Sequence, residues 1–287
     1  MILILTYHKI ATGRTNDAAD FYTITRDGLE SQLCALRTRG YRCLGIDELL
    51  RDSPPVRPFP DLPSPLPSGG EDQGEGDIRT TSGSDGPPPQ NSCLLTFDDG
   101  TQDHYDIALP LLEEHKFQGV FFVCTGKFDL PGFLTRAQVR EIAQRGHIIG
   151  CHSDRNHRLD RLTDEQIRER IALSRQVLTE VVGASPVLFA PPGGYINDRV
   201  RKVVLANGMR IIRTMQWGYN DRPDLAALQC IPMNRNIGPK QFNDILDRRR
   251  AGLLTVSYRI KEFVKWVLPS RVYHGVREAI SATHDNT

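Results

Sequence analysis

Short apolar runs alternate with helix-like segments along most of this sequence, and that alternation restricts the possible folds more than any other feature. The first run, Ile2–Thr6, is almost wholly apolar, as expected for a strand that is buried on both faces. Further runs of this kind are LLTF, GVFFVCT, HIIGCH, PVLFA and MRIIRTM. Strands that alternate with helices form a mostly parallel sheet or barrel, so the sequence predicts an α/β fold.

Two of the predicted helices carry a clear start signal. Thr135 is followed by Gln138, and Thr163 by Gln166, and both pairs match the capping box, in which the two side chains satisfy backbone amides. Glycines follow these helices at 146 and 183. Further helices are predicted over 27–39, 105–115 and 198–206. The helices therefore lie between the strands, as parallel strands require.

The composition changes between residues 52 and 92. Proline, glycine, serine and acidic residues dominate there, as in PLPSGGEDQGEGD and SGSDGPPPQ. Such a segment buries too little apolar surface to offset its ordering entropy, so we predict a disordered insertion over 52–92. A domain linker is the alternative, although the segment before it is short for an independent core. We expect one α/β domain over 1–245 and a helical C-terminal extension over 246–287.

Charge and cysteine content exclude several classes of protein. The net charge of +1 gives no field that would attract nucleic acid, and no nucleic-acid-binding motif is present. Six cysteines at irregular spacing disfavour a zinc ribbon or a disulfide scaffold and suit reduced thiols in the cytoplasm. The opening MILILTYHKI has no basic leader or cleavage site, so it is predicted to be a strand and not a signal peptide.

The stretch LLTVSYRIKEFVKWVLPSRVY near the C-terminus combines apolar residues with several basic ones. The commoner explanation is a helix that packs on its own domain and leaves its basic side in water. The alternative is a basic amphipathic helix that rests on a membrane surface. We therefore expect a cytoplasmic protein, with peripheral membrane contact as the open alternative.

Residues with metal-binding chemistry follow two of the apolar runs. Asp98 and Asp99 end CLLTFDDG, and His152 and His157 lie in GCHSDRNHRL. Parallel strands bring their carboxyl ends to one edge, where active sites gather. A divalent metal there would offset the repulsion of the two carboxylates, with one as ligand and the other as base. Spacing does not decide which is which, and a simple turn or solvated histidines are the alternatives.

These motifs resemble those of the polysaccharide deacetylase (NodB-homology) family of metal-dependent carbohydrate esterases. The resemblance rests on TFDDG, H-S-x…H and a Pro-Pro-Gly loop, with support from LTYHKI, GYRCLGIDELL, GFLTRAQVREIAQRGHIIGCHS, RTMQWGYN and CIPMNR. It implies a distorted (β/α) barrel, usually of seven parallel strands, and removal of an acetyl group from a sugar. It also implies that Asp98 is the catalytic base and that the metal ligands are Asp99, His152 and His157.

The histidine motifs depart from this family in two ways. His152 and His157 are five positions apart, one more than in the family. Either a bulge in the loop restores the geometry, or Asp154 supplies a ligand in place of one histidine. The family's late Leu-x-x-His, which supplies a general acid, has no clean match. His274 and His8 are the candidates for that acid, although a structural role is the simpler explanation for each.

The third motif also differs, because Ala190 stands where the family has an arginine that orients the base. Arg213, on the next strand, could replace that arginine, or it could pair with a surface acid. We assign Arg213 to the catalytic group beside Asp98. The loop after Ala190 and a later tryptophan are predicted to bind substrate, through Pro192, Gly193, Gly194, Tyr195 and Trp217.

Taken with the resemblance, the sequence predicts a metal-dependent hydrolase, most suitably a zinc enzyme. Its expected substrate is an N-acetylated amino sugar of a glycan, a glycolipid or a biosynthetic precursor. Two other functions stay open. One is a catalytically silent carbohydrate-binding module of the same fold, and the other is a metal-dependent hydrolase of a different small amide.

Overall fold

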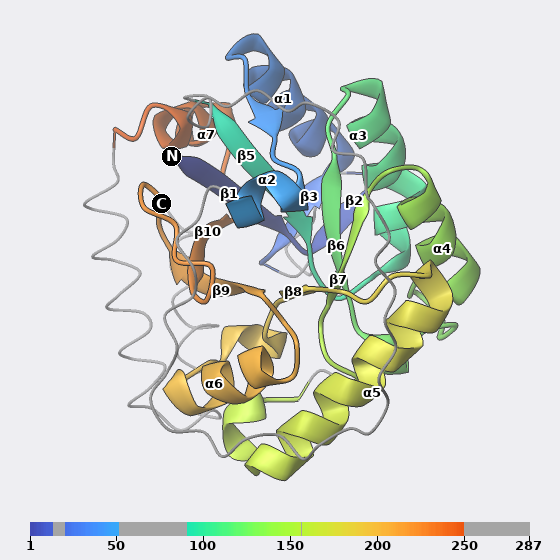
Figure 1. Cartoon of the computed structure of the whole chain (residues 1–287). Helices are drawn as coiled ribbons and strands as arrows, with labels where there is room; N and C mark the ends of the chain where they lie inside the picture. The colour runs from blue at the N-terminus through green and yellow to red at the C-terminus, as the bar shows by residue number, and fades with distance from the viewer. Residues whose placement is uncertain (14–20, 52–90, 156, 250–287) are drawn as a thin grey trace, which may run out of the picture.

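A closed barrel of parallel strands forms the centre of the molecule (Figure 1). The structure, a computed structural model, describes residues 1–13, 21–51, 91–155 and 157–249. Going round the barrel, each strand pairs with the next, and β1 closes it by pairing with both β10 and β5. The strands are β1 (Ile2–Tyr7), β5 (Ser92–Phe97), β6 (Gly119–Val123), β7 (Ile148–Cys151), β8 (Leu188–Phe189), β9 (Ile211–Trp217) and β10 (Leu228–Pro232). The predicted distorted (β/α) barrel of seven parallel strands is thus confirmed.

The helices surround this barrel on its outside (Figure 1), apart from the short α2 (Ile46–Arg51), whose Leu49 packs with the barrel interior. They are α1 (Arg26–Thr38), α2 (Ile46–Arg51), α3 (Leu109–Glu114), α4 (Arg136–Gln144), α5 (Asp164–Val182), α6 (Asp198–Ala206) and α7 (Pro239–Leu246). The short strand β4 (Arg42–Cys43) pairs with the first two residues of β5, and β2 (Lys9–Ala11) pairs with β3 (Thr23–Thr25). Each long connection between neighbouring barrel strands therefore carries a helix back along the barrel wall.

The helix starts follow the local sequence signals. Both capping boxes are present, with Thr135 and Thr163 each accepting from the backbone amide of the glutamine three residues later. Helix α5 ends at Gly183 as predicted, and α6 has the predicted bounds. The segment predicted as one helix over 105–115 instead begins with a wide π-helical turn, His104–Ala108, before α3.

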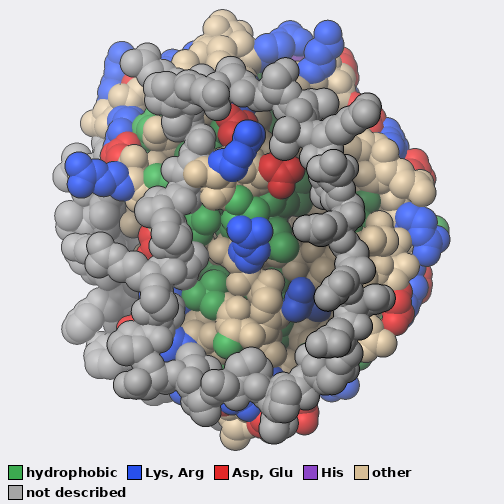
Figure 2. All heavy atoms as spheres, viewed as in Figure 1, with side chains coloured by type: hydrophobic (Ala, Val, Ile, Leu, Met, Phe, Trp, Pro, Cys, Tyr) green, Lys and Arg blue, Asp and Glu red, His purple; other side chains and the backbone are tan. Residues whose placement is uncertain are grey.

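The apolar side chains form two layers, because successive residues of each strand face opposite sides of the barrel wall. In β1, Leu3 and Leu5 join the layer between strands and helices, whereas Ile2 and Ile4 join the barrel interior. Leu49 of α2 belongs to the interior layer as well. Figure 2 shows hydrophobic side chains near the centre of the face seen in Figure 1, with charged side chains around them. This double burial explains why the strands read as continuous apolar runs.

The predicted insertion extends too far at its C-terminal end. Ser92 is fully buried and starts β5, where it pairs with Ile2 and Arg42. A serine in a polar stretch gave no sign of a strand, but its partners on both sides supply the ladder hydrogen bonds that hold it. Residues 52–90 and the C-terminal segment 250–287, including His274 and the basic amphipathic stretch, lie outside the described residues. In the part that is described, no helix has the length and apolar character needed to cross a bilayer.

Candidate active site

Asp98 and Asp99 follow β5 directly, and the backbone sends their side chains to different surroundings. Asp98 continues the ladder by donating its amide to the Tyr7 carbonyl at 2.9 Å, and it is 3% exposed. Asp99 has a φ of +76°, a conformation that aspartate tolerates better than most residues. Gly100 follows with a φ of +71°. This sharp turn places the two carboxylates in different surroundings, and it leaves Asp99 partly exposed.

A buried ion pair holds Asp98. The Nη2 atom of Arg213, on β9, donates to both carboxylate oxygens of Asp98, and Arg213 is 2% exposed. Burial by itself would raise the pKa of the Asp98 carboxyl. The charge of Arg213 outweighs burial and holds that pKa below its usual range. Asp98 is therefore an ionised carboxylate at neutral pH, in the state needed to accept a proton.

The carboxylate of Asp99 faces a second pair of groups. Its Oδ1 atom lies 3.7 Å from His152 Nε2 and 3.7 Å from Lys127 Nζ. His152 follows β7, and its Nδ1 atom is held at 2.8 Å by the carbonyl of Ala190. Because a carbonyl oxygen only accepts, Nδ1 donates in that contact, and Nε2 is the ring nitrogen that faces Asp99. Asp99 and His152 thus offer the oxygen and nitrogen donors that a zinc ligand pair needs.

The other predicted ligands are placed differently. His157 is exposed, and the ligand atoms of Asp99, His152 and His157 do not all lie within 4.8 Å of one another. Asp154 is 8% exposed and accepts two hydrogen bonds from Arg170 at 3.1 and 3.3 Å, so its carboxylate is already engaged. Two of the three predicted ligands therefore fit a divalent metal as they stand. The role of His157 stays a prediction.

The Pro-Pro-Gly-Gly-Tyr loop is joined to Arg213 through Met215. Gly194 has a φ of +74°, and a Cβ there would lie 2.6 Å from the Met215 Cγ atom. The Met215 Sδ atom lies 3.0 Å from Arg213 Nη1. Tyr195 is covered on one face by the Arg158 guanidinium, 3.6 Å from the ring centroid. The loop thus lies beside the buried ion pair, and the substrate contacts of Pro192, Gly193, Gly194 and Tyr195 stay predictions.

Trp217 ends β9 and is half-buried. Its ring meets Tyr219 edge-on at a centroid distance of 5.6 Å, and the Tyr219 hydroxyl donates to the Ile245 carbonyl of α7. These contacts attach Trp217 to the layer between the barrel and α7. They describe a packing residue, and the substrate contact of Trp217 stays a prediction.

Three further residues border the site. His8, just after β1, brings its Nε2 atom to 3.8 Å from Asp98 Oδ2 and stacks on Tyr22. The fully buried His104 contacts the His8 carbonyl through Nε2. The position of His8 just after a strand marks it as a candidate from the sequence. Applying the same strand-end criterion to GVFFVCTGK would also have pointed to Lys127. His104 lies inside a helical segment, and nothing in its sequence context marks it.

Comparison with known proteins finds one matching family model and several similar sequences. Residues 85–212 match the sequence model of the polysaccharide deacetylase family. A peptidoglycan-N-acetylglucosamine deacetylase of Bacillus cereus is 30% identical over 138 residues, which are 48% of this chain and 61% of that protein. The peptidoglycan-N-acetylmuramic acid deacetylase PdaA of Bacillus subtilis is 31% identical over 141 residues, 46% of this chain and 51% of that protein. The resemblance seen in the sequence is thus confirmed.

A solved structure supports the fold. The Streptococcus pyogenes deacetylase PplD superposes with a TM-score of 0.67 at 21% identity, covering 85% of this chain and 96% of that one. At this identity the likeness establishes the fold alone. The chain spans about 60% or less of the length of the curated relatives named above.

Proposed function

We propose that this protein hydrolyses the N-acetyl group of an amino sugar, because residues 85–212 match the sequence model of the polysaccharide deacetylase family. The substrate would be part of a glycan, a glycolipid or a biosynthetic precursor. The observation that carries the proposal is the buried Asp98–Arg213 pair next to Asp99 and His152. Metal-dependent amide hydrolysis requires an ionised general base beside side chains that can ligate a metal, and these residues match that arrangement.

Asp98 acts as the general base of the proposed reaction. It accepts a proton from a water molecule, whose oxygen attacks the acetyl carbon. Arg213 fixes both oxygens of the carboxylate, and its charge keeps Asp98 ionised. Asp99 and His152 would hold a divalent cation, and zinc suits their oxygen and nitrogen donors. When bound there, such a cation polarises a carbonyl and lowers the pKa of water.

The leaving nitrogen also needs a proton as its bond to the acetyl carbon breaks. Burial lowers the pKa of His8, with Asp98 acting in the opposite direction, so His8 is neutral at neutral pH and is a poor source of that proton. Asp98 holds the proton it took from water. We therefore assign to Asp98 the return of that proton to the amine, after which acetate and the free amino sugar leave.

The names of relatives support an N-acetylated glycan as the substrate class. The two Bacillus relatives above are named as peptidoglycan deacetylases, and a Cryptococcus neoformans relative, 28% identical over 123 residues, is named chitin deacetylase 1. Both polymers carry N-acetylhexosamine units, so oligomers of N-acetylglucosamine are the first substrates to test.

The decisive experiment measures acetate release from N-acetylglucosamine oligomers by zinc-loaded protein. Asp98→Asn is expected to lower the rate by about 10²–10⁴-fold, the usual contribution of a general base. Asp106→Asn is the matched control, because Asp106 is exposed and contacts only Gln102 among the hydrogen bonds described. Equal rates for Asp98→Asn and the wild type would remove Asp98 from its proposed role.

The same experiment separates the alternatives. The exposed position of His157 is the observation that favours a silent module, since it leaves two ligands at the site. Oligomer binding without acetate release at any zinc concentration would support that module. Release from small amides but not from acetylated sugars would support a hydrolase of another substrate.

A further inference from the structure

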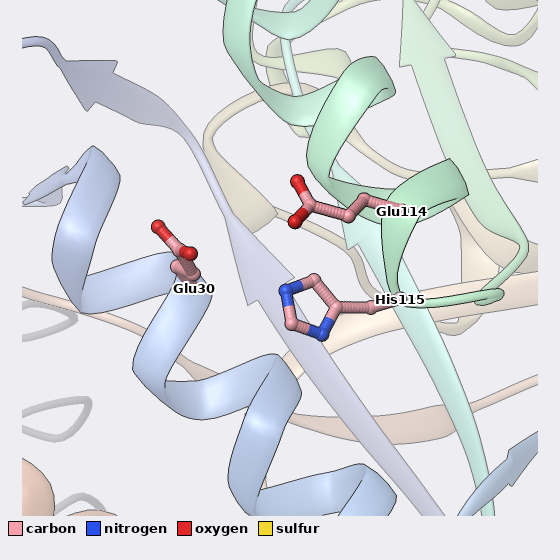
Figure 3. Close-up of side chains that lie close together, drawn as sticks. All are labelled: Glu30, Glu114 and His115. Atoms are coloured by element: carbon pink, nitrogen blue, oxygen red, sulfur yellow. The ribbon is translucent and has the colours of Figure 1, made fainter.

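We propose that Glu30, Glu114 and His115 form a second divalent-metal site, outside the barrel between α1 and α3. One ligand atom from each residue lies within 4.8 Å of the others. Glu30 comes from α1, and Glu114 and His115 end α3 (Figure 3). Among the described residues, this is the one set of three acid, histidine or cysteine side chains grouped this closely. None of them belongs to the site at the strand ends.

His115 is the residue that turns these acids into a site. It is 5% exposed, and its Nε2 atom is buried without a hydrogen-bond partner. Buried polar atoms are nearly always paired, so this nitrogen calls for a partner that protein groups do not supply. Figure 3 shows the imidazole ring directed toward both carboxylates. A cation between the three side chains would satisfy Nε2.

The second ring nitrogen of His115 has its own contact. Its Nδ1 atom lies 4.0 Å from the Sγ atom of Cys34, one helical turn after Glu30 on α1. Ligating histidines usually have the other nitrogen held by a neighbouring group, which fixes the ring and leaves one lone pair for the metal. Cys34 occupies that supporting position.

The carboxylates are able to close around an ion. Glu30 accepts from Arg26 through Oε2 at 2.7 Å, so its Oε1 atom is left for a ligand bond. Glu114 is exposed. Donors around zinc stand about 3.3–3.6 Å apart, given bond lengths near 2.0–2.2 Å. A small rotation of two flexible glutamate side chains would bring the three donors to that spacing, with water completing the coordination.

The donor set selects the class of cation. One imidazole nitrogen with two carboxylates suits zinc and similar transition metals, whereas magnesium and calcium prefer oxygen donors alone. A metal held by α1 and α3 would join two helices that pack on the same barrel wall. It would bind the folded chain only, so it would stabilise the fold.

The test uses the Asp99→Asn/His152→Gln double variant, which lacks both ligands proposed at the strand ends. Bound zinc is counted by equilibrium dialysis against zinc alone and, in parallel, by Co²⁺ absorption. We expect one zinc per chain and a higher melting temperature with zinc than without it. Adding Glu114→Gln is expected to weaken zinc binding by at least about tenfold and to abolish the rise in melting temperature.

Glu113→Gln is the matched control, because this neighbouring acid pairs with Arg145 and is not part of the cluster. It is expected to leave zinc binding unchanged. If the double variant binds no zinc, or if Glu114→Gln binds zinc as well as its parent, the proposal is wrong. Acetate release does not enter this test, so its outcome is independent of the function proposed above.

Discussion

Asp98 and Asp99 are neighbours in the sequence, yet they occupy opposite kinds of environment. Asp98 is buried, continues the strand ladder and is paired with a buried arginine. Asp99 is partly exposed, has a positive φ and lies 3.7 Å from both a histidine and a lysine. The fold therefore separates two equal charges by one turn of backbone and gives each its own counter-charge.

The contrast teaches how the two roles are divided. Both oxygens of the Asp98 carboxylate accept from Arg213. This pairing keeps Asp98 ionised and fixes its direction, but it limits the contact that Asp98 can make with a metal. The partly exposed carboxylate of Asp99 lies 3.7 Å from His152 Nε2, and an oxygen donor beside a nitrogen donor suits metal ligation. The sequence left open which aspartate did which, and the surroundings now favour Asp98 as base and Asp99 as ligand.

The largest effect is expected when Arg213, the partner of the buried Asp98, is removed. Arg213→Met leaves the Asp98 carboxylate buried without its main partner, so we expect a loss of about 3–5 kcal/mol in the free energy of unfolding. Urea unfolding at pH 7 measures it. The Asp98→Leu/Arg213→Met double variant removes both charges and is expected to be more stable than Arg213→Met alone. A single variant as stable as the wild type would contradict the buried pair.

A smaller change tests the support behind the arginine. Gly194→Ala forces a side chain into a left-handed conformation and toward Met215, so we expect a loss of about 1–3 kcal/mol. Gly132→Ala is the control, because Gly132 also has a positive φ but nothing lies within 4 Å of its Cβ position. Both are compared by urea unfolding and acetate release. Equal losses in the two variants would exclude a special role for the Met215 contact.

The smallest expected effect on stability comes from the rim. Asp99→Asn keeps the shape of a partly exposed side chain, and asparagine also tolerates a positive φ. We expect the free energy of unfolding to change by no more than about 0.5 kcal/mol, while zinc affinity at the strand ends and acetate release fall. Dialysis and urea unfolding measure the two properties. Destabilisation as large as that of Arg213→Met would erase the contrast between the aspartates.

Local features of the fold could be predicted from the sequence. The capping boxes at Thr135 and Thr163 depend on residues three positions apart, and both form as expected. The apolar runs predicted six of the seven barrel strands, because both faces of each of these strands are buried. Strand β10 was not among the predicted runs. The start of β5 was missed, because Ser92 is held by partners on two other strands and its own neighbours in sequence are polar.

The site depended on longer-range information. The strand-end rule and the family resemblance brought forward Asp98, Asp99 and His152, and the structure gathers them at one edge of the barrel. The contact between Arg213 and Asp98 follows from the closure of the barrel, so the sequence left a surface pairing open. The position of His157 depends on how one added residue is accommodated in a loop, which no pattern in the sequence determines.

The closure of the barrel by β1 has a consequence for how the protein comes into being. Leu5 of β1 pairs with Leu95 on one side and with Ile231 on the other. During synthesis the apolar strand β1 therefore leaves the ribosome well before its partner β10, which lies near the end of the described chain. Until β10 is made, one edge of β1 has no strand partner. Chaperones that bind apolar strands would act mainly during that interval.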